Sequence, residues 1–261
     1  MTTLVILRFL GIFAAYMGVT LALPALMFRR ILRGRSLAEQ FLMCYTFGNF
    51  YIINIVFLLQ LLHISNFFTL AGLTAVLSIV IGGRVNRIPL KQQAGNTGHL
   101  LGKLLRGRMK LKSAIFLFLG KCAAGIKRLA KFFYRHIVKN PIQSMLLLGI
   151  GVCLCWIYGR QIILVYGYRA SDIPVHMSWI NEMSRGKIFA KGVYPFGFHC
   201  IIYYLHAVFR FDTYVILCQF FFVQVIFMHL VLLAMLKQLC KTKYIPYIGT
   251  FVFLLGNFWS G

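Results

Sequence analysis

Six long apolar runs dominate the sequence and restrict what the chain can fold into. They cover residues 4–27, 41–62, 67–83, 143–166, 213–236 and 244–261. Such runs approach the roughly 20 residues that an α-helix needs to cross a hydrocarbon core. Hydrophobic residues make up 60% of the chain, above the roughly 45–50% of a soluble domain. The sequence therefore predicts an all-α, polytopic transmembrane helical bundle with about six spans.

The basic residues of the chain predict its orientation in a cell membrane. Lysine and arginine number 28 against four acidic residues, for a formal net charge of +24. They cluster in the connectors 28–40, 84–142 and 237–243, which six spans would place on one side of the membrane. The positive-inside rule makes that side cytoplasmic, and the turn at 63–66 and the loop 168–212 extracytoplasmic. Contact with anionic membrane lipid explains the charge, so no nucleic-acid partner is expected.

The connector 84–142 divides the chain into three expected parts. It holds fourteen basic residues and no acid, and its second half interleaves them with Leu, Ile and Phe. That pattern predicts a helix lying in the cytoplasmic interface. A three-span module at 1–83 would precede this interfacial segment, and a membrane region at 143–261 would follow it. Because the chain ends in an apolar run without a polar tail, we expect this last region to be incomplete and the chain to be part of a longer protein.

The seven cysteines predict no metal site. Most of them lie inside apolar runs, and none forms a CxxC pair or a cluster with histidine at zinc-ligand spacing. Structural zinc sites need four such ligands. The cysteines are therefore expected to be small buried hydrophobic residues.

The loop 168–212 concentrates ionisable residues that are rare elsewhere in the chain. It carries three of the four acids and three of the seven histidines: Asp172, Glu182, Asp212, His176, His199 and His206. A polar loop between membrane spans that collects the few carboxylates is the best candidate for a functional site. The alternative is a solvated connector whose acids simply face water.

Local signals give this loop an expected structure. Residues 172–185 have an apolar face and end at Gly186, which predicts a short amphipathic helix along the outer surface. Asp172, His176 and Trp179 would share one face of it, because they are separated by four and three residues. A Gly- and Pro-rich turn then leads into the next apolar helix.

Several polar residues of the loop also have a purely structural interpretation. Asp212 directly precedes an apolar run and has the position of a helix N-cap. Glu182 has basic neighbours with which it can form a local ion pair. His199 and His206 can be interfacial histidines that donate a hydrogen bond to a carbonyl group.

The motifs of this loop resemble those of a known superfamily. They are D-x-x-x-H at Asp172 and His176, then Gly186, then YPFGFH at 194–199. This arrangement resembles the GT-C superfamily of membrane glycosyltransferases, which use lipid-phosphate sugar donors. The resemblance covers roughly 143–261. It departs from the superfamily pattern in two ways, because three spans precede the loop here and fewer spans follow it than that superfamily has.

The resemblance implies transfer of a hexosyl or pentosyl group from a polyprenyl-phosphate-linked sugar at the outer membrane face. Asp172 matches the carboxylate that serves there as catalytic base or metal-linked acid, so a divalent cation requirement stays open. An inverting transfer needs a base for the acceptor hydroxyl and positive partners for the leaving phosphate. The substrate-binding candidates are Arg160, Arg169 and Arg210 for phosphate, His176 and His199 for acceptor or phosphate, and Tyr194 for stacking on a sugar. Arg160 can instead snorkel to lipid headgroups.

The competing interpretations are a noncatalytic multi-span transporter, a lipid-handling membrane protein, and a membrane scaffold. A transporter is expected to carry polar or broken helices near the middle of the membrane. The predicted spans lack charged residues near their centres, and the polar residues gather at the outer interface. This distribution favours the transferase.

Overall fold

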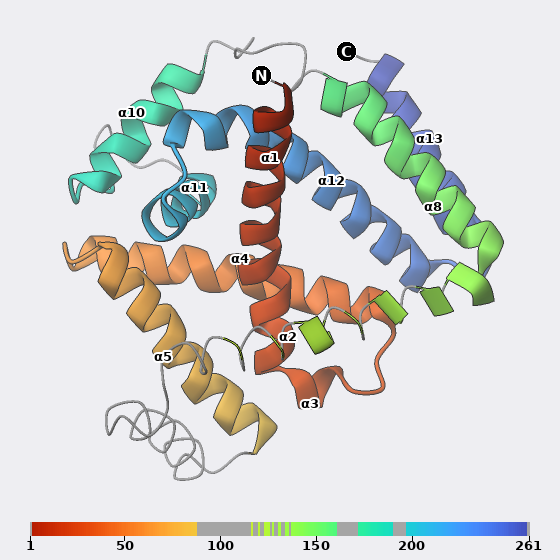
Figure 1. Cartoon of the computed structure of the whole chain (residues 1–261), viewed down its shortest axis with the longest axis horizontal. Coiled ribbons are helices and arrows are strands. Elements are labelled where there is room, and N and C mark those ends of the chain that lie inside the picture. Colours follow the sequence, from red (N-terminus) through yellow and green to blue (C-terminus); the bar gives the residue numbers. More distant parts are fainter. Residues whose placement is uncertain are drawn as a thin grey trace.

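The computed structural model describes residues 2–87, 140–160, 172–189 and 197–259, together with scattered residues of 116–139. This part of the chain is helical and contains no strand. Five helical segments are long and apolar enough to cross a membrane: Thr3–Met27, Leu37–Leu61, Phe67–Asn86, Pro141–Gly159 and Thr213–Leu239. The structure confirms the predicted all-α polytopic bundle, shown in Figure 1.

The sixth predicted span is shorter than expected. Residues 244–261 contain helix α13 (Ile245–Trp259), whose apolar stretch is Ile245–Gly256. At about 1.5 Å per residue, the 15 residues of α13 extend only ~22 Å, against a hydrocarbon core of roughly 30 Å. Helix α11 (Gly197–Phe209) is apolar and also short. The described chain therefore has five full-length candidate spans and two shorter apolar helices.

Capping residues set the helix boundaries at the membrane edges. Helix α4 (Leu37–Leu61) begins earlier than the predicted residue 41, because Ser36 and Glu39 form a capping box. Helix α5 (Phe67–Asn86) begins after an equivalent box at Asn66. Helix α12 (Thr213–Leu239) begins after Asp212, whose Oδ1 accepts a hydrogen bond from Val215 N at 3.1 Å.

The first span is an interrupted helix. It consists of α1 (Thr2–Met17), a π-helical turn η1 (Gly18–Ala22) and α2 (Leu23–Met27), and the short α3 (Arg29–Leu32) follows. Pro24 lies in the first turn of α2, where its missing N–H is tolerated. The π turn brings the backbone of Thr20 so close to α4 that only a glycine, Gly48, fits opposite it.

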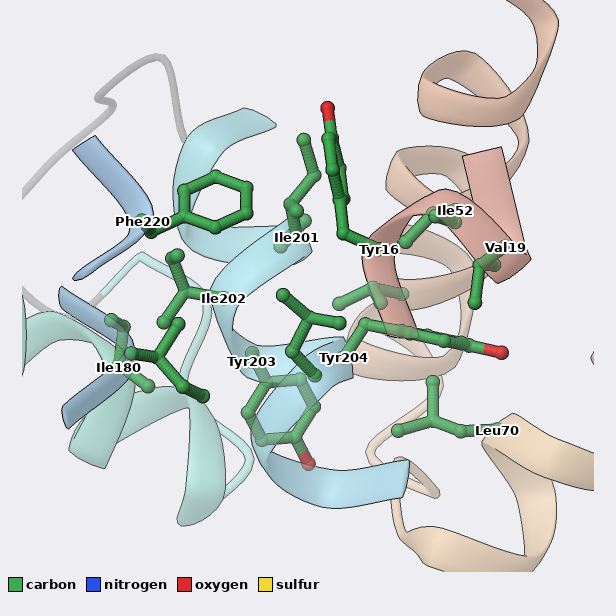
Figure 2. Close-up of a cluster of buried hydrophobic side chains, with 14 of the residues drawn as sticks. Tyr16, Val19, Ile52, Leu70, Ile180, Ile201, Ile202, Tyr203, Tyr204 and Phe220 are labelled. Carbon is green, nitrogen blue, oxygen red and sulfur yellow. The ribbon is translucent and has the colours of Figure 1, made fainter. Parts of the chain in front are cut away.

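Helix α11 lies at the centre of the main apolar core. Figure 2 shows its residues Ile201, Ile202, Tyr203 and Tyr204 between α1, α4 and α5 on one side and α10 (Ile173–Ser184) and α12 on the other. All four side chains are buried. The hydroxyl of Tyr204 donates to Thr74 Oγ1 at 3.1 Å, which satisfies its polar end inside this core. The helices of 1–83 and those of 197–239 therefore share one core.

A second, smaller cluster joins the remaining helices. Helix α8 (Pro141–Leu154) continues into the π turn η2 (Cys155–Gly159) and lies beside α13 (Figure 1). The buried members of this second cluster come from α8, α12 and α13: Ile150, Leu154, Val225, Leu233, Tyr247 and Leu254. One face of α8 is exposed and apolar, as expected of a helix in contact with lipid.

Hydrogen bonds divide the helix ends between two sides of the bundle. On one side, His63 in the α4–α5 turn bonds the carbonyl of Gly186 at 2.9 Å. On the other side, Arg30 N donates to Asn86 Oδ1 at 2.9 Å, and Gln238 Nε2 donates to Ser36 Oγ at 3.0 Å. The connector 28–40 thus contacts the start of connector 84–142 and the connector 237–243, away from the 63–66 turn. The interfacial helix predicted within 84–142 falls largely outside the described residues.

Candidate functional site

The amphipathic helix predicted at 172–185 is helix α10 (Ile173–Ser184). Its apolar face buries Ile173, Ile180 and Met183, whose spacing of seven and three residues places them on one side of the helix. Gly186 ends the segment with φ of +79°, a conformation that favours glycine. The prediction of this helix and of its end is therefore confirmed.

Two residues of the α4–α5 turn region hold the carboxyl end of α10. Buried Gln60 donates its Nε2 to the carbonyl of Met183 at 2.9 Å. His63 bonds the carbonyl of Gly186 at 2.9 Å. The carbonyl of Met183 belongs to the last turn of α10, where it also accepts from Gly186 N at 3.0 Å, and the carbonyl of Gly186 lies just beyond the helix end. Helix α10 is therefore fixed across the end of the bundle (Figure 1).

A pair of histidines joins α10 to α11. His176 Nδ1 and His199 Nε2 are 3.0 Å apart, so one ring nitrogen donates to the other. His199 is only 2% exposed, whereas His176 is partly exposed. Trp179 lies against both rings, with centroid distances of 5.8 Å to His176 and 5.1 Å to His199. Phe198 contacts both imidazoles as well.

The buried position of His199 changes its protonation. Burial, together with the smaller effect of the neighbouring His176, lowers the pKa of His199 from its ordinary value of 6.5 to about 4. The neutral form is therefore the one that the fold accommodates. His199 is better suited to accept or relay a hydrogen bond at neutral pH than to pair with an anion.

We expect the protein to lose stability as the pH falls from 6.5 towards 4, because the unfolded chain then protonates His199 and the folded chain does not. The slope from this residue is at most ~1.4 kcal/mol per pH unit. Thermal unfolding in detergent between pH 7.5 and 4 measures it. The variant His199→Gln should flatten the curve, whereas exposed His63→Gln should leave its shape unchanged. Equal curves for wild type and His199→Gln would contradict the assignment.

Asp172 lies at the amino-terminal end of α10. It is exposed, and its backbone carbonyl accepts the hydrogen bond from His176 N at 3.0 Å. Its carboxylate makes no hydrogen bond that caps α10, whereas that of Asp212 caps α12. The site therefore combines an accessible carboxylate with an imidazole pair one turn further along.

The other predicted substrate-binding residues have different positions. Arg160 follows η2 with its guanidinium 5.7 Å from the ring of Trp156, and it is exposed. Arg210 has φ of +61° and lies over the ring of Phe67 at 5.2 Å. Arg210 directly follows the end of α11, so about three helical turns separate it from His199. Arg169 and Tyr194 fall outside the described residues.

The structural interpretations of three loop residues are confirmed. Asp212 is an N-cap, and His206 Nδ1 bonds the carbonyl of Phe211 at 2.8 Å. Glu182 forms ion pairs with Arg185 at 2.8 Å and Lys187 at 3.8 Å. Each pairing is between residues at most five apart in the chain, which is why the sequence alone indicated them.

The described residues do not gather a set of metal ligands. Among them, no three histidine, cysteine, aspartate or glutamate side chains converge well enough to hold an ion. The two imidazoles of the site bond each other. A metal-linked role for Asp172 therefore has no supporting ligand set in this part of the chain.

Comparison with known proteins assigns no function to this chain. No family model matches the sequence, and neither a curated protein nor a solved structure matches it. A functional proposal therefore depends on the residues of this chain and their geometry.

Proposed function

We propose that the protein is a membrane glycosyltransferase that moves a sugar from a polyprenyl-phosphate donor to an acceptor hydroxyl at the outer face of the membrane. The observation that carries the proposal is the exposed Asp172 on a helix fixed by Gln60, His63 and the His176–His199 pair. A base must be held in place to work, and these contacts supply that rigidity.

In the proposed reaction, Asp172 takes the proton of the acceptor hydroxyl as its oxygen attacks the anomeric carbon. The bond from that carbon to the donor phosphate breaks, and the phosphate leaves with the electron pair. The imidazole pair orients the acceptor, since neutral His199 can donate or accept a hydrogen bond through His176. Arg160 and Arg169 are the candidates to stabilise the leaving phosphate, because a guanidinium pairs with phosphate through two hydrogen bonds.

The proposal places α10 outside the cell and the basic connectors in the cytoplasm. In a cysteine-free background, we expect Lys187→Cys to react fully with a membrane-impermeant maleimide on intact cells. The matched variant Lys241→Cys, at an exposed lysine of a basic connector, should react only after the membrane is permeabilised. The reverse pattern would contradict the orientation and, with it, an outer active site.

Sugar transfer itself is the direct test of the function. Purified full-length protein in vesicles is supplied with radiolabelled polyprenyl-phosphate sugars and acceptor lipids or glycans from the same membrane. Loss of label from the donor with gain in an acceptor would support the transferase. A donor pool that is merely moved between leaflets, without cleavage, would contradict it.

A second candidate, transport or lipid handling, is favoured by the interior of the bundle. The first span contains the π turn η1 before Pro24, and such turns inside helices are frequent at functional sites. Tyr16 in the same span donates to Asn49 of α4 at 2.8 Å. In the described part of the chain, buried Gln219 Oε1 and His229 Nε2 have no hydrogen-bond partner. Leaflet-to-leaflet movement of lipid in the same vesicles distinguishes this candidate from sugar transfer.

A further inference from the structure

The segment that carries Arg29 and Arg30 contacts the end of α5 that carries Arg84 and Arg87. This end of α5 lies away from α10 (Figure 1). Arg29 and Arg30 begin α3, and Arg84 and Arg87 lie at the end of α5. All four are exposed. Each is within three residues of the hydrogen bond between Arg30 N and Asn86 Oδ1, which is 2.9 Å long. We refer to these four residues as the arginine cluster.

Asn86 fixes the geometry of the arginine cluster. Besides accepting from Arg30 N, its side-chain Nδ2 donates to the carbonyls of Met27 at 2.9 Å and Gly82 at 2.7 Å. Gly82 lies against the first span, since a Cβ there would be in van der Waals contact with Met27 Cα at 3.4 Å. The amide of Asn86 therefore bonds both α5 and the segment that leads into α3. The backbone that carries these arginines is held together by uncharged groups.

No carboxylate is available to neutralise the arginine cluster. The whole sequence has four acidic residues, and only Glu39 lies outside the loop 168–212. Glu39 accepts hydrogen bonds from Ser36 and has Arg35 as its ion-pair partner at 3.8 Å. Four like charges on two backbone segments that contact each other repel one another, and an external anion that binds between them offsets this repulsion. Phosphate suits this role, because guanidinium groups bind it in a bidentate manner.

Exposed apolar side chains extend from the arginine cluster towards the membrane interior. Leu26 of α2 is 70% exposed, and Ile79 of α5, two turns before Asn86, is 53% exposed. Both belong to candidate membrane spans. An acyl chain can therefore lie on these residues while its headgroup contacts the arginines, which a soluble anion cannot do.

We propose that the arginine cluster is a binding site for an anionic phospholipid whose headgroup carries two phosphates. A single phosphate pairs well with one or two guanidinium groups, whereas the cluster presents four from two segments. Two linked phosphates fit that distribution and bridge α3 to α5. The bound lipid would thus fasten the first span to the third on the side where the basic connectors meet.

The test is a titration of the full-length protein in neutral detergent with cardiolipin, a two-phosphate lipid, followed by native mass spectrometry. We expect the double variant Arg30→Gln/Arg84→Gln to weaken cardiolipin binding about 30-fold, since each basic residue near a lipid surface contributes about fivefold. The control Lys241→Gln/Lys243→Gln removes the same charge from another basic connector and should change the affinity less than about twofold. Phosphatidylglycerol, with one phosphate, should bind the wild type more weakly at equal phosphate concentration.

The variant Asn86→Ala distinguishes a binding site of fixed geometry from nonspecific electrostatic attraction between anionic lipid and basic residues, because it removes no charge. We expect it to weaken cardiolipin binding at least about fivefold by releasing α3 from α5. Equal losses for the arginine and lysine double variants would overturn the proposal, as would equal affinities for the two lipids. Tighter binding of a short single-stranded RNA than of cardiolipin would overturn it as well. Thermal unfolding without lipid establishes that each variant is folded.

Discussion

Replacing Gly48 with alanine is expected to lower the free energy of unfolding by about 3 kcal/mol, the upper part of the range for overpacked sites. The new Cβ would lie 2.8 Å from the carbonyl carbon of Thr20, and closer still to its Cα and oxygen. Because those are backbone atoms, no side-chain rotation can relieve the overlap. The π turn η1 and α4 must move apart, which opens the core around Tyr16 and Ile52. Unfolding of the purified protein in mixed detergent micelles measures the change.

Gly149 of α8 provides the matched control. It also lies inside a candidate span, but nothing is within 4 Å of the position that its Cβ would occupy. Gly149→Ala should leave stability unchanged or raise it by up to ~1 kcal/mol, since alanine is the better helix former. If both alanine variants unfolded like the wild type, the close approach of η1 to α4 would be wrong.

The contact at Gly48 is a part of the fold that the sequence does not predict, whereas the long spans are predicted. Apolar runs predicted the long spans because span length follows directly from membrane thickness. The π turn at Gly18–Ala22 directly precedes Pro24, which lacks an N–H and would clash with the carbonyl of Thr20 in a regular α-helix. The packing of this turn on Gly48, 28 residues after Thr20, has no local signal in the sequence. The start of α4 is different, because the capping box of Ser36 and Glu39 is a local sequence signal that indicates a helix start before residue 41.

Polar residues inside the spans were predicted with mixed success for a physical reason. Asn49, Asn54 and Gln60 in the apolar run 41–62 predict a helix face that packs on other helices rather than on lipid. Asn49 accepts from Tyr16, and Gln60 reaches Met183, as expected. Asn54 is exposed and donates to the carbonyl of Phe50 at 2.7 Å in its own helix, so this part of the prediction was wrong. An asparagine can satisfy its amide on the preceding turn and then needs no neighbouring helix.

The candidate site divides in the same way between local and distant pairings. The helix α10 and the cap at Asp212 depend on neighbouring residues and were predicted. The hydrogen bond between His176 and His199 joins two helices, and the spacing of 23 residues between them does not predict it. The rings of Trp179 and Phe198 also belong to that cluster, and each contacts His199.

Replacing Asp172 with asparagine is expected to lower the rate of sugar transfer by roughly 10²- to 10⁴-fold, the usual contribution of a general base. Asparagine has nearly the same shape and keeps the backbone bond to His176, so the helix and its contacts should persist. Only the ability to take a proton from the acceptor is removed. Single-turnover transfer in vesicles, with protein in excess over the labelled donor, measures the chemical step.

Asp212→Asn is the control that separates catalysis from charge. Both variants remove one carboxylate from the loop 168–212, and asparagine caps a helix as well as aspartate does. The Asp212 variant should therefore transfer sugar at the wild-type rate and unfold at the same temperature. Equal loss in the two variants would indicate that the charge of the outer face matters rather than a base at α10. Wild-type transfer by Asp172→Asn would exclude this residue as the base, because an amide cannot accept the proton at neutral pH.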